Sequence, residues 1–127
     1  RKELTDEWLK SGVSEHRDFA ILTNEITKAW SGKSVSEYKA YKSLKKESLR
    51  DNMTNMELVL NMLAEVTTTD ISRAENPKGF AESKAVAQRG GKVAGNARKD
   101  VERQTGRSVI SSKNADSADE LEGGDKE

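Results

Sequence analysis

The chain has 127 residues, enough for one domain of ordinary size but too few for two independent cores. Its apolar fraction of 33% and charged fraction of 35% are polar for a globular chain, and the lack of cysteine excludes disulfides, thiolate metal sites and cysteine nucleophiles. No apolar run approaches the roughly 18 to 20 residues that span a bilayer, and no signal peptide is recognisable, so we expect a cytoplasmic protein without membrane contact.

The formal net charge of zero hides an uneven distribution along the chain. When Lys and Arg are counted against Asp and Glu, residues 1–76 carry 12 against 13, residues 77–113 carry 9 against 3, and residues 114–127 carry 1 against 6. A basic segment and an acidic tail therefore follow a near-neutral body. This asymmetry indicates a site for a polyanion, or a tail that folds back to screen the basic segment.

Apolar residues at helical spacing predict two helices in the first half of the chain. The first opens near Ser14 and ends at Gly32, where glycine can take the left-handed conformation that closes a helix. The second opens at Ser34, with Glu37 three residues later in the capping-box pattern. A polar stretch interrupts it, and we expect a turn near Asp51.

A third helix opens at Thr54, which forms a second capping-box pattern with Glu57. Apolar residues cover more than half of its circumference, a breadth typical of the most buried helix of a bundle. These residues are Met56, Val59, Leu60, Met62, Leu63 and Val66. We therefore predict that it is the central helix. Three threonines at positions 67–69 have poor helix propensity and predict fraying before Ile71.

Pro77 and Gly79 break the chain before a long last helix over residues 80–104, about 37 Å in length. Its predicted apolar stripe consists of Val86, Gly90, Val93, Ala97 and Val101. No strand pairs are indicated, so we predict an all-α fold, a small bundle of four or five helices with a long glycine-containing C-terminal helix. Residues 1–113 form its helical domain, and residues 114–127 are too polar and acidic to fold and form a disordered tail.

Small residues gather on the long helix, at Gly90, Gly91, Ala94 and Gly95. A phosphate-binding loop is disfavoured, because Lys92 is followed by valine and no strand precedes the glycines. Three glycines in a helix cost about 3 kcal/mol unless packing offsets them. The pattern therefore favours close packing against a partner helix, with a homodimer as one form of it, and leaves a kink or hinge as the alternative.

The same helix carries a basic row made of Arg89, Lys92, Lys99 and Arg103, with Asp100 at its border. Cations at this spacing can contact successive phosphates and would give salt-dependent binding without sequence information. The alternative is an ordinary solvated face. No aromatic residue accompanies the row, so stacking on single-stranded bases by this helix is not indicated.

Nothing in the sequence indicates catalysis, a cofactor or a metal. His16 is the single histidine and lacks converging ligands, so we expect it to face solvent. Glu57 and Glu65 occupy a cap and a helix surface, where structural roles suffice, and an unrecognised hydrolase would need carboxylates clustered in a cleft. We expect the aromatic residues Trp8, Trp30, Tyr38 and Tyr41 to lie in the core or an interface.

Three segments in fixed order resemble one family. They are FAILTNEITKAWSG, LRDNMTNMELVLNMLAEVTTTDIS and PKGFAESKAVAQRGGKVAGNARKDVERQTGRSVISSKN. Together they look like the C-terminal domain of DNA-damage-inducible protein D (DinD), a family that resembles phage antirepressors with a Bro-type N-terminal domain. The resemblance spans nearly residues 1–114. Because no Bro-type domain is present and the first residue is arginine, we expect a piece or a truncated version of a longer protein.

The resemblance implies a bacterial cytoplasmic protein that is made in the SOS response and modulates recombination through RecA filaments. It supplies no catalytic residues. The function expected from it is a non-enzymatic interaction domain, and the alternative is a nucleic-acid-binding module that uses the basic row. The candidate partners are RecA or its nucleoprotein filament, DNA, and a second copy of the chain in a homodimer.

Overall fold

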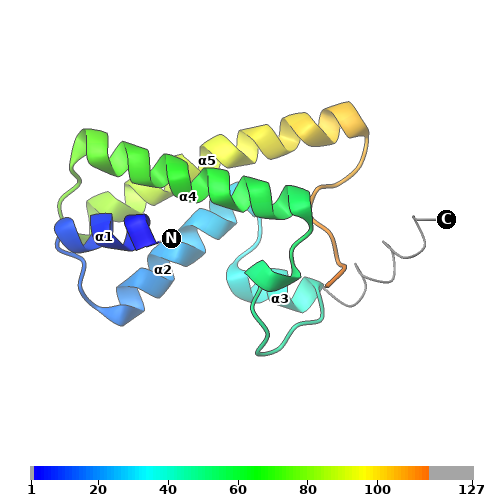
Figure 1. Ribbon diagram of the computed structural model, residues 1–127, viewed down its shortest axis with the longest axis horizontal. Coiled ribbons are helices and arrows are strands. Elements are labelled where there is room, and N and C mark those ends of the chain that lie inside the picture. Colours follow the sequence, from blue (N-terminus) through cyan, green and yellow to red (C-terminus); the bar gives the residue numbers. More distant parts are fainter. Residues whose placement is uncertain (1, 115–127) are drawn as a thin grey trace.

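The computed structural model describes residues 2–114 and confirms the all-α fold, since this range contains helices and no strand (Figure 1). The elements in chain order are α1 (Lys2–Lys10), α2 (His16–Ser31), α3 (Val35–Tyr41), the 3-10 turn η1 (Arg50–Asn52), α4 (Asn55–Glu75) and α5 (Gly79–Thr105). The predicted acidic tail, apart from Asn114, lies outside the described residues.

The helix ends follow the cap signals in the sequence. Ser34 and Thr54 both accept a hydrogen bond from the backbone N–H three residues later, and Glu37 and Glu57 complete both capping boxes, as predicted. α2 closes at Gly32 in the left-handed conformation, with φ of 80°. These local signals therefore place the starts of α3 and α4 and the end of α2.

α5 lies behind α4 in Figure 1 and packs against both α2 and α4, with its buried residues between Ser83 and Gly95. A Cβ atom on Gly90 would lie 2.8 Å from the Cα of Thr68 in α4. On Gly91 it would lie 2.5 Å from the Cβ of Ala29, and on Gly95 2.7 Å from the Ala29 carbonyl oxygen, both in α2. The helix continues through the glycines from residue 79 to residue 105, so they provide close packing and not a hinge.

Within residues 2–114, α4 contacts α1, α2 and α5 and buries more residues than any other helix, but its predicted buried face was wrong. Val59 and Val66 are 58% and 55% exposed, whereas Glu57 and Thr68 on the opposite face are fully buried. The prediction failed because it assumed that apolar side chains mark the buried face. Here the buried face of α4 is rich in polar groups that have partners inside the chain, and α4 shares the middle of the bundle with α5, which packs against both α2 and α4.

Two further expectations about the long helices are corrected. α4 does not fray at its threonines but runs on to Glu75, because Thr68 and Thr69 are buried and Thr68 packs against Gly90 of α5. Their hydroxyls donate to the carbonyls of Ala64 and Glu65 at 2.8 and 2.9 Å. The apolar stripe expected on α5 is displaced around the helix. Val93 is 45% exposed, and the buried positions are Ser83, Val86, Ala87, Gly90, Gly91, Ala94 and Gly95.

α1 is the helix that the sequence reasoning did not identify. It buries Leu4 and Trp8, and the Trp8 ring stacks on Phe19 of α2 at 5.9 Å between centroids. Arg73 of α4 binds Glu7 of α1 at 3.2 Å. The four-residue spacing of Leu4 and Trp8 was the available signal.

Replacement of Gly91 by alanine tests the close approach of α5 and α2. Alanine normally favours a helix over glycine by about 1 kcal/mol, but here the added methyl group meets Ala29 and the Ile26 carbonyl. We expect Gly91→Ala to lower the free energy of unfolding by about 1 to 3 kcal/mol in urea titration. Asn96→Ala, at an exposed position on the same helix, is the control and should leave stability unchanged or raise it. A stabilised Gly91→Ala variant would contradict the packing.

Candidate interaction surfaces

In the structure, two residues of the predicted basic row of α5 form ion pairs with carboxylates, and the other two have no acidic partner within residues 2–114. Arg89 binds Glu75 of α4 through two hydrogen bonds of 2.7 Å, and this contact holds the pKa of the Glu75 carboxyl below its usual value. Arg103 binds Asp100 at 2.6 Å. Two of the four predicted cations are therefore already matched by carboxylates.

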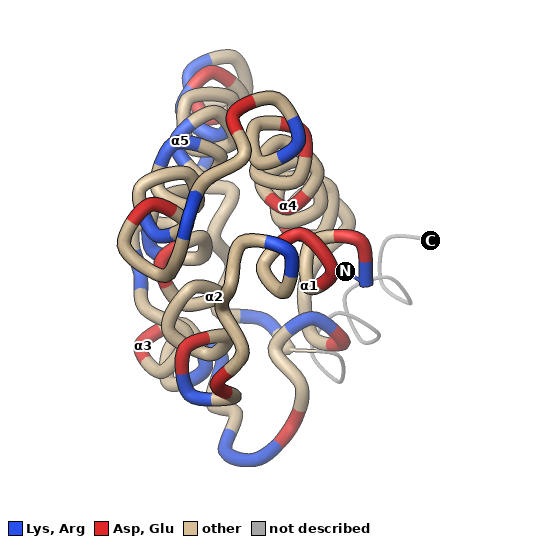
Figure 2. Tube along the Cα trace, turned by 90° about the vertical axis from the view of Figure 1, so that its left-hand side faces the viewer, with Lys and Arg blue, Asp and Glu red and all other residues tan. Residues whose placement is uncertain are grey.

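Lys92 and Lys99 are the open members of the row. Both are exposed on α5, as is Asn96 between them, and neither lysine has an acidic partner within residues 2–114. They stand seven residues apart, about 10 Å along the helix. Figure 2 shows Lys and Arg, in blue, recurring along α5. The open cationic surface, meaning the cations without an acidic partner, therefore consists of Lys92 and Lys99 and not of all four residues of the predicted row.

The small residues of α5 form no free surface. Gly90, Gly91, Ala94 and Gly95 are all buried, and the three glycines meet α2 and α4 of the same chain. The partner helices for this face thus lie within the chain, so these residues offer nothing to a second molecule.

The outward side of α4 forms an apolar surface that the sequence reasoning had placed in the core. We name it the α4 apolar face and define it by Met56, Val59, Met62 and Val66. Their exposed fractions are 42%, 58%, 50% and 55%. Such a continuous exposed apolar strip is typical of an interaction site.

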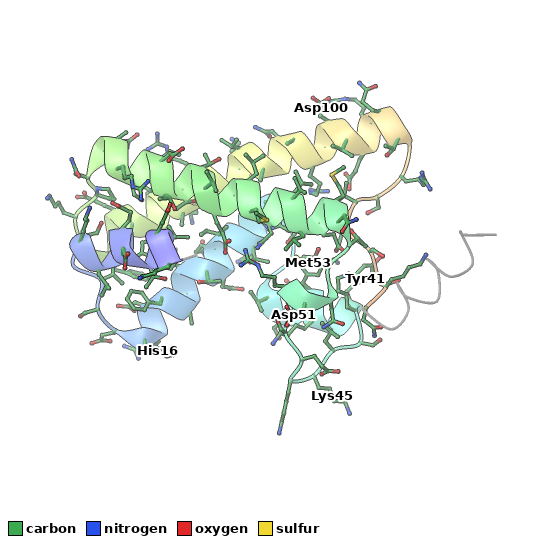
Figure 3. The ribbon with its side chains drawn as sticks, in the orientation of Figure 1. His16, Tyr41, Lys45, Asp51, Met53 and Asp100 are labelled. Atoms are coloured by element: carbon green, nitrogen blue, oxygen red, sulfur yellow. The ribbon has the colours of Figure 1, made fainter. Side chains whose placement is uncertain are left out.

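A groove of about 520 Å³ lies beside the α4 apolar face. Leu4 of α1 and Met53 line it together with Met62 and Val66, so the apolar surface continues from α4 towards α1. Arg50 and Glu65 also border it and bind each other at 2.5 Å. Met53 and the neighbouring Asp51 are labelled in Figure 3.

A buried polar cluster around Lys42 and Glu57 was not predicted. Both side chains are fully buried, with the Lys42 Nζ 2.8 Å from the Glu57 Oε1. The Tyr38 hydroxyl donates to the other carboxylate oxygen, and burial together with this hydrogen bond raises the pKa of Tyr38 far above its usual value. The cluster thus holds a carboxylate that is neutralised by an ammonium group inside the fold.

The same cluster binds the segment that follows α5. The Ser111 N–H donates to Glu57 at 3.2 Å, and the Lys42 Nζ donates to the carbonyl of Lys113 at 2.6 Å. The Asn114 amide in turn donates to the Lys42 carbonyl at 3.2 Å. Val109 and Ile110 are buried in the hydrophobic core, so the segment 109–114 is anchored to the bundle by both apolar and polar contacts. No short-range pattern marks these contacts, because up to 72 residues separate the partners.

The residues considered as candidates for catalysis or metal binding do not cluster in one site. His16 is exposed at the start of α2, as expected (Figure 3), Glu57 lies in the buried cluster, and Glu65 is paired with Arg50. Over the described range there is no group of three or more residues suited to holding a metal ion. Trp8, Trp30 and Tyr38 are buried, whereas Tyr41 is 45% exposed.

None of the helices placed within residues 2–114 has the length and apolar character of a membrane-spanning segment.

The arrangement defines an all-α bundle built around a long glycine-containing helix, with exposed apolar residues on α4 and exposed lysines on α5. The family model of the DinD C-terminal domain matches residues 1–113, so the chain belongs to that family, which is named for a DNA-damage-inducible protein. Searches of curated proteins and of solved structures give no match.

The buried ion pair can be tested by removing its cation. Lys42→Met leaves the Glu57 carboxylate buried without its counter-charge and should lower the free energy of unfolding by about 3 to 5 kcal/mol. The double variant Lys42→Met/Glu57→Gln removes both charges and should recover part of that loss. Urea unfolding of the two variants measures the difference. A single variant as stable as the parent chain would show that the pair contributes little.

Proposed function

We propose that this chain is a non-enzymatic interaction domain of the DNA-damage response that modulates recombination through RecA nucleoprotein filaments. Its membership of the DinD C-terminal domain family supports the link to DNA damage. The proposal implies a cytoplasmic location. A domain of this kind acts by binding other molecules through its exposed surfaces and needs no catalytic cleft.

The observation that carries the proposal is the open cationic part of α5. Lys92 and Lys99 project from a helix that packs against two others, so their separation is fixed by the fold. A nucleoprotein filament presents regularly spaced phosphates and acidic side chains, and two fixed cations can bind such a repeat without reading sequence.

The same lysines favour a second candidate, a nucleic-acid-binding module that contacts DNA directly. It differs from the first in needing no protein filament, and it predicts binding that weakens steeply as salt is raised. The relation of the family to phage antirepressors with a Bro-type N-terminal domain stays a prediction, as does the origin of the chain in a longer protein.

Charge reversal on α5 separates the two candidates. Lys92→Glu/Lys99→Glu should weaken co-sedimentation with RecA filaments on single-stranded DNA by about tenfold or more, because two attractive contacts become repulsive. Binding to the same DNA without RecA, measured by fluorescence anisotropy at low salt, should be much weaker than filament binding.

The matched control is Lys45→Glu/Lys46→Glu, which reverses two exposed cations away from α5 and should bind filaments normally. Equal binding to naked DNA and to filaments would favour the nucleic-acid module. Unchanged filament binding by Lys92→Glu/Lys99→Glu would remove the role of α5.

A further inference from the structure

The α4 apolar face itself carries no charged side chain, whereas the groove beside it is bordered by Glu3, Arg50 and Asp51. Over residues 55–69 of α4, the charged side chains are Glu57 and Glu65, and both are buried, with Glu65 paired to Arg50 at the groove. The exposed and half-exposed positions of this stretch are uncharged. They are Asn55, Met56, Leu58, Val59, Met62, Leu63, Val66 and Thr67. In a chain with 35% charged residues, about four helical turns without an exposed charge indicate a surface that is covered in the working protein.

The position of α4 leaves this strip open to a large partner. α4 lies at the front of the molecule in Figure 1 and at its right-hand side in Figure 2, so α5 packs on its inner side and leaves its outer side uncovered. From Met56 to Val66 the strip extends about 15 Å, the length of a short helix–helix contact. The groove beside Met62 provides a depression into which side chains of an opposing helix can insert.

We propose that the α4 apolar face binds a second copy of this chain, with the two α4 helices antiparallel about a two-fold axis near Met62 and Leu63. In a two-fold interface each surface must complement itself. An antiparallel register centred between residues 62 and 63 brings Val59 of each copy opposite Val66 of the other.

The polar ends of the strip favour this register over others. It places the exposed carboxylate of Asp70 opposite the exposed amide of Asn55 in the second copy, so an acceptor meets a donor. A parallel arrangement would instead place the two Asp70 carboxylates side by side, which costs free energy. The antiparallel arrangement also opposes the two helix dipoles.

The overall charge of the chain favours a second copy as the occupant. With 22 basic and 22 acidic residues, two copies approach without net repulsion, and a net charge near zero promotes self-association. The interface excludes the open lysines of α5, because these lie on a different helix. A dimer therefore presents two cationic faces at once.

Charge substitutions on α4 test both the contact and its register. Val59→Glu/Val66→Glu puts carboxylates opposite carboxylates across the axis and should weaken dimerisation at least 30-fold in sedimentation equilibrium. Val59→Glu/Val66→Lys puts a carboxylate opposite an ammonium group in the antiparallel register and should dimerise more tightly than the first variant. Val93→Glu changes an equally apolar and 45% exposed position on α5, and it should dimerise like the parent chain.

Cross-linking provides a second readout that does not depend on affinity. The chain lacks cysteine, so Met62→Cys introduces a single thiol beside the proposed axis. A short bis-maleimide should join two copies of Met62→Cys efficiently and two copies of Val93→Cys poorly. Circular dichroism of every variant checks that the helices are retained.

Two results would overturn the proposal. One is a parent chain that stays monomeric at several hundred micromolar, and the other is equal cross-linking through positions 62 and 93. If the parent chain is monomeric and Val59→Glu/Val66→Glu abolishes RecA filament binding, the face belongs to a different partner.

Discussion

Where α5 crosses α2 and α4 there is no room for a methyl group on any of its three central glycines. Because the backbones approach so closely, one long helix can pack against two others and form the centre of the bundle without large apolar side chains. This explains how a chain with only 33% apolar residues builds a core. The same packing determines which side of α5 faces solvent, so Lys92 and Lys99 are exposed on a helix that its neighbours hold in place. The stability of the bundle and the geometry of its cationic surface thus depend on the same contacts.

A second constraint acts at the other end of the bundle, where Lys42 and Glu57 are buried together. Burial of an ion pair costs desolvation free energy, which is offset only when both charges have further hydrogen-bond partners. Tyr38, Ser111 and the Lys113 carbonyl provide them. These partners come from α3 and from the segment 109–114, so the pair selects one arrangement of α3, α4 and that segment. A purely apolar contact would be less selective.

The sequence predicted where several helices begin and end, but it did not predict which side of a helix faces the core. Capping boxes at Ser34 and Thr54 and the closing Gly32 are short-range signals, and the structure confirms them. The buried side of α4 could not be read from hydrophobic periodicity, because Glu57, Asn61 and Glu65 are buried there with partners 15 or more residues away. The basic row was found, but Glu75 lies 14 residues from Arg89 and its pairing is a tertiary contact. The Lys42 cluster had no sequence signal, since 71 residues separate Lys42 from Lys113.

The hydrogen bonds of the segment 109–114 bear on where this folding unit can be cut. α5 ends at Thr105, and a boundary based on helices alone would fall at Gly106. Shortening the chain there would remove the buried Val109 and Ile110 and expose the Lys42 ion pair to water. The shortest piece that keeps the core intact therefore extends through Asn114, eight residues past that glycine. Expression boundaries and domain transplants in this family should be drawn from the last buried contact and not from the last helical turn.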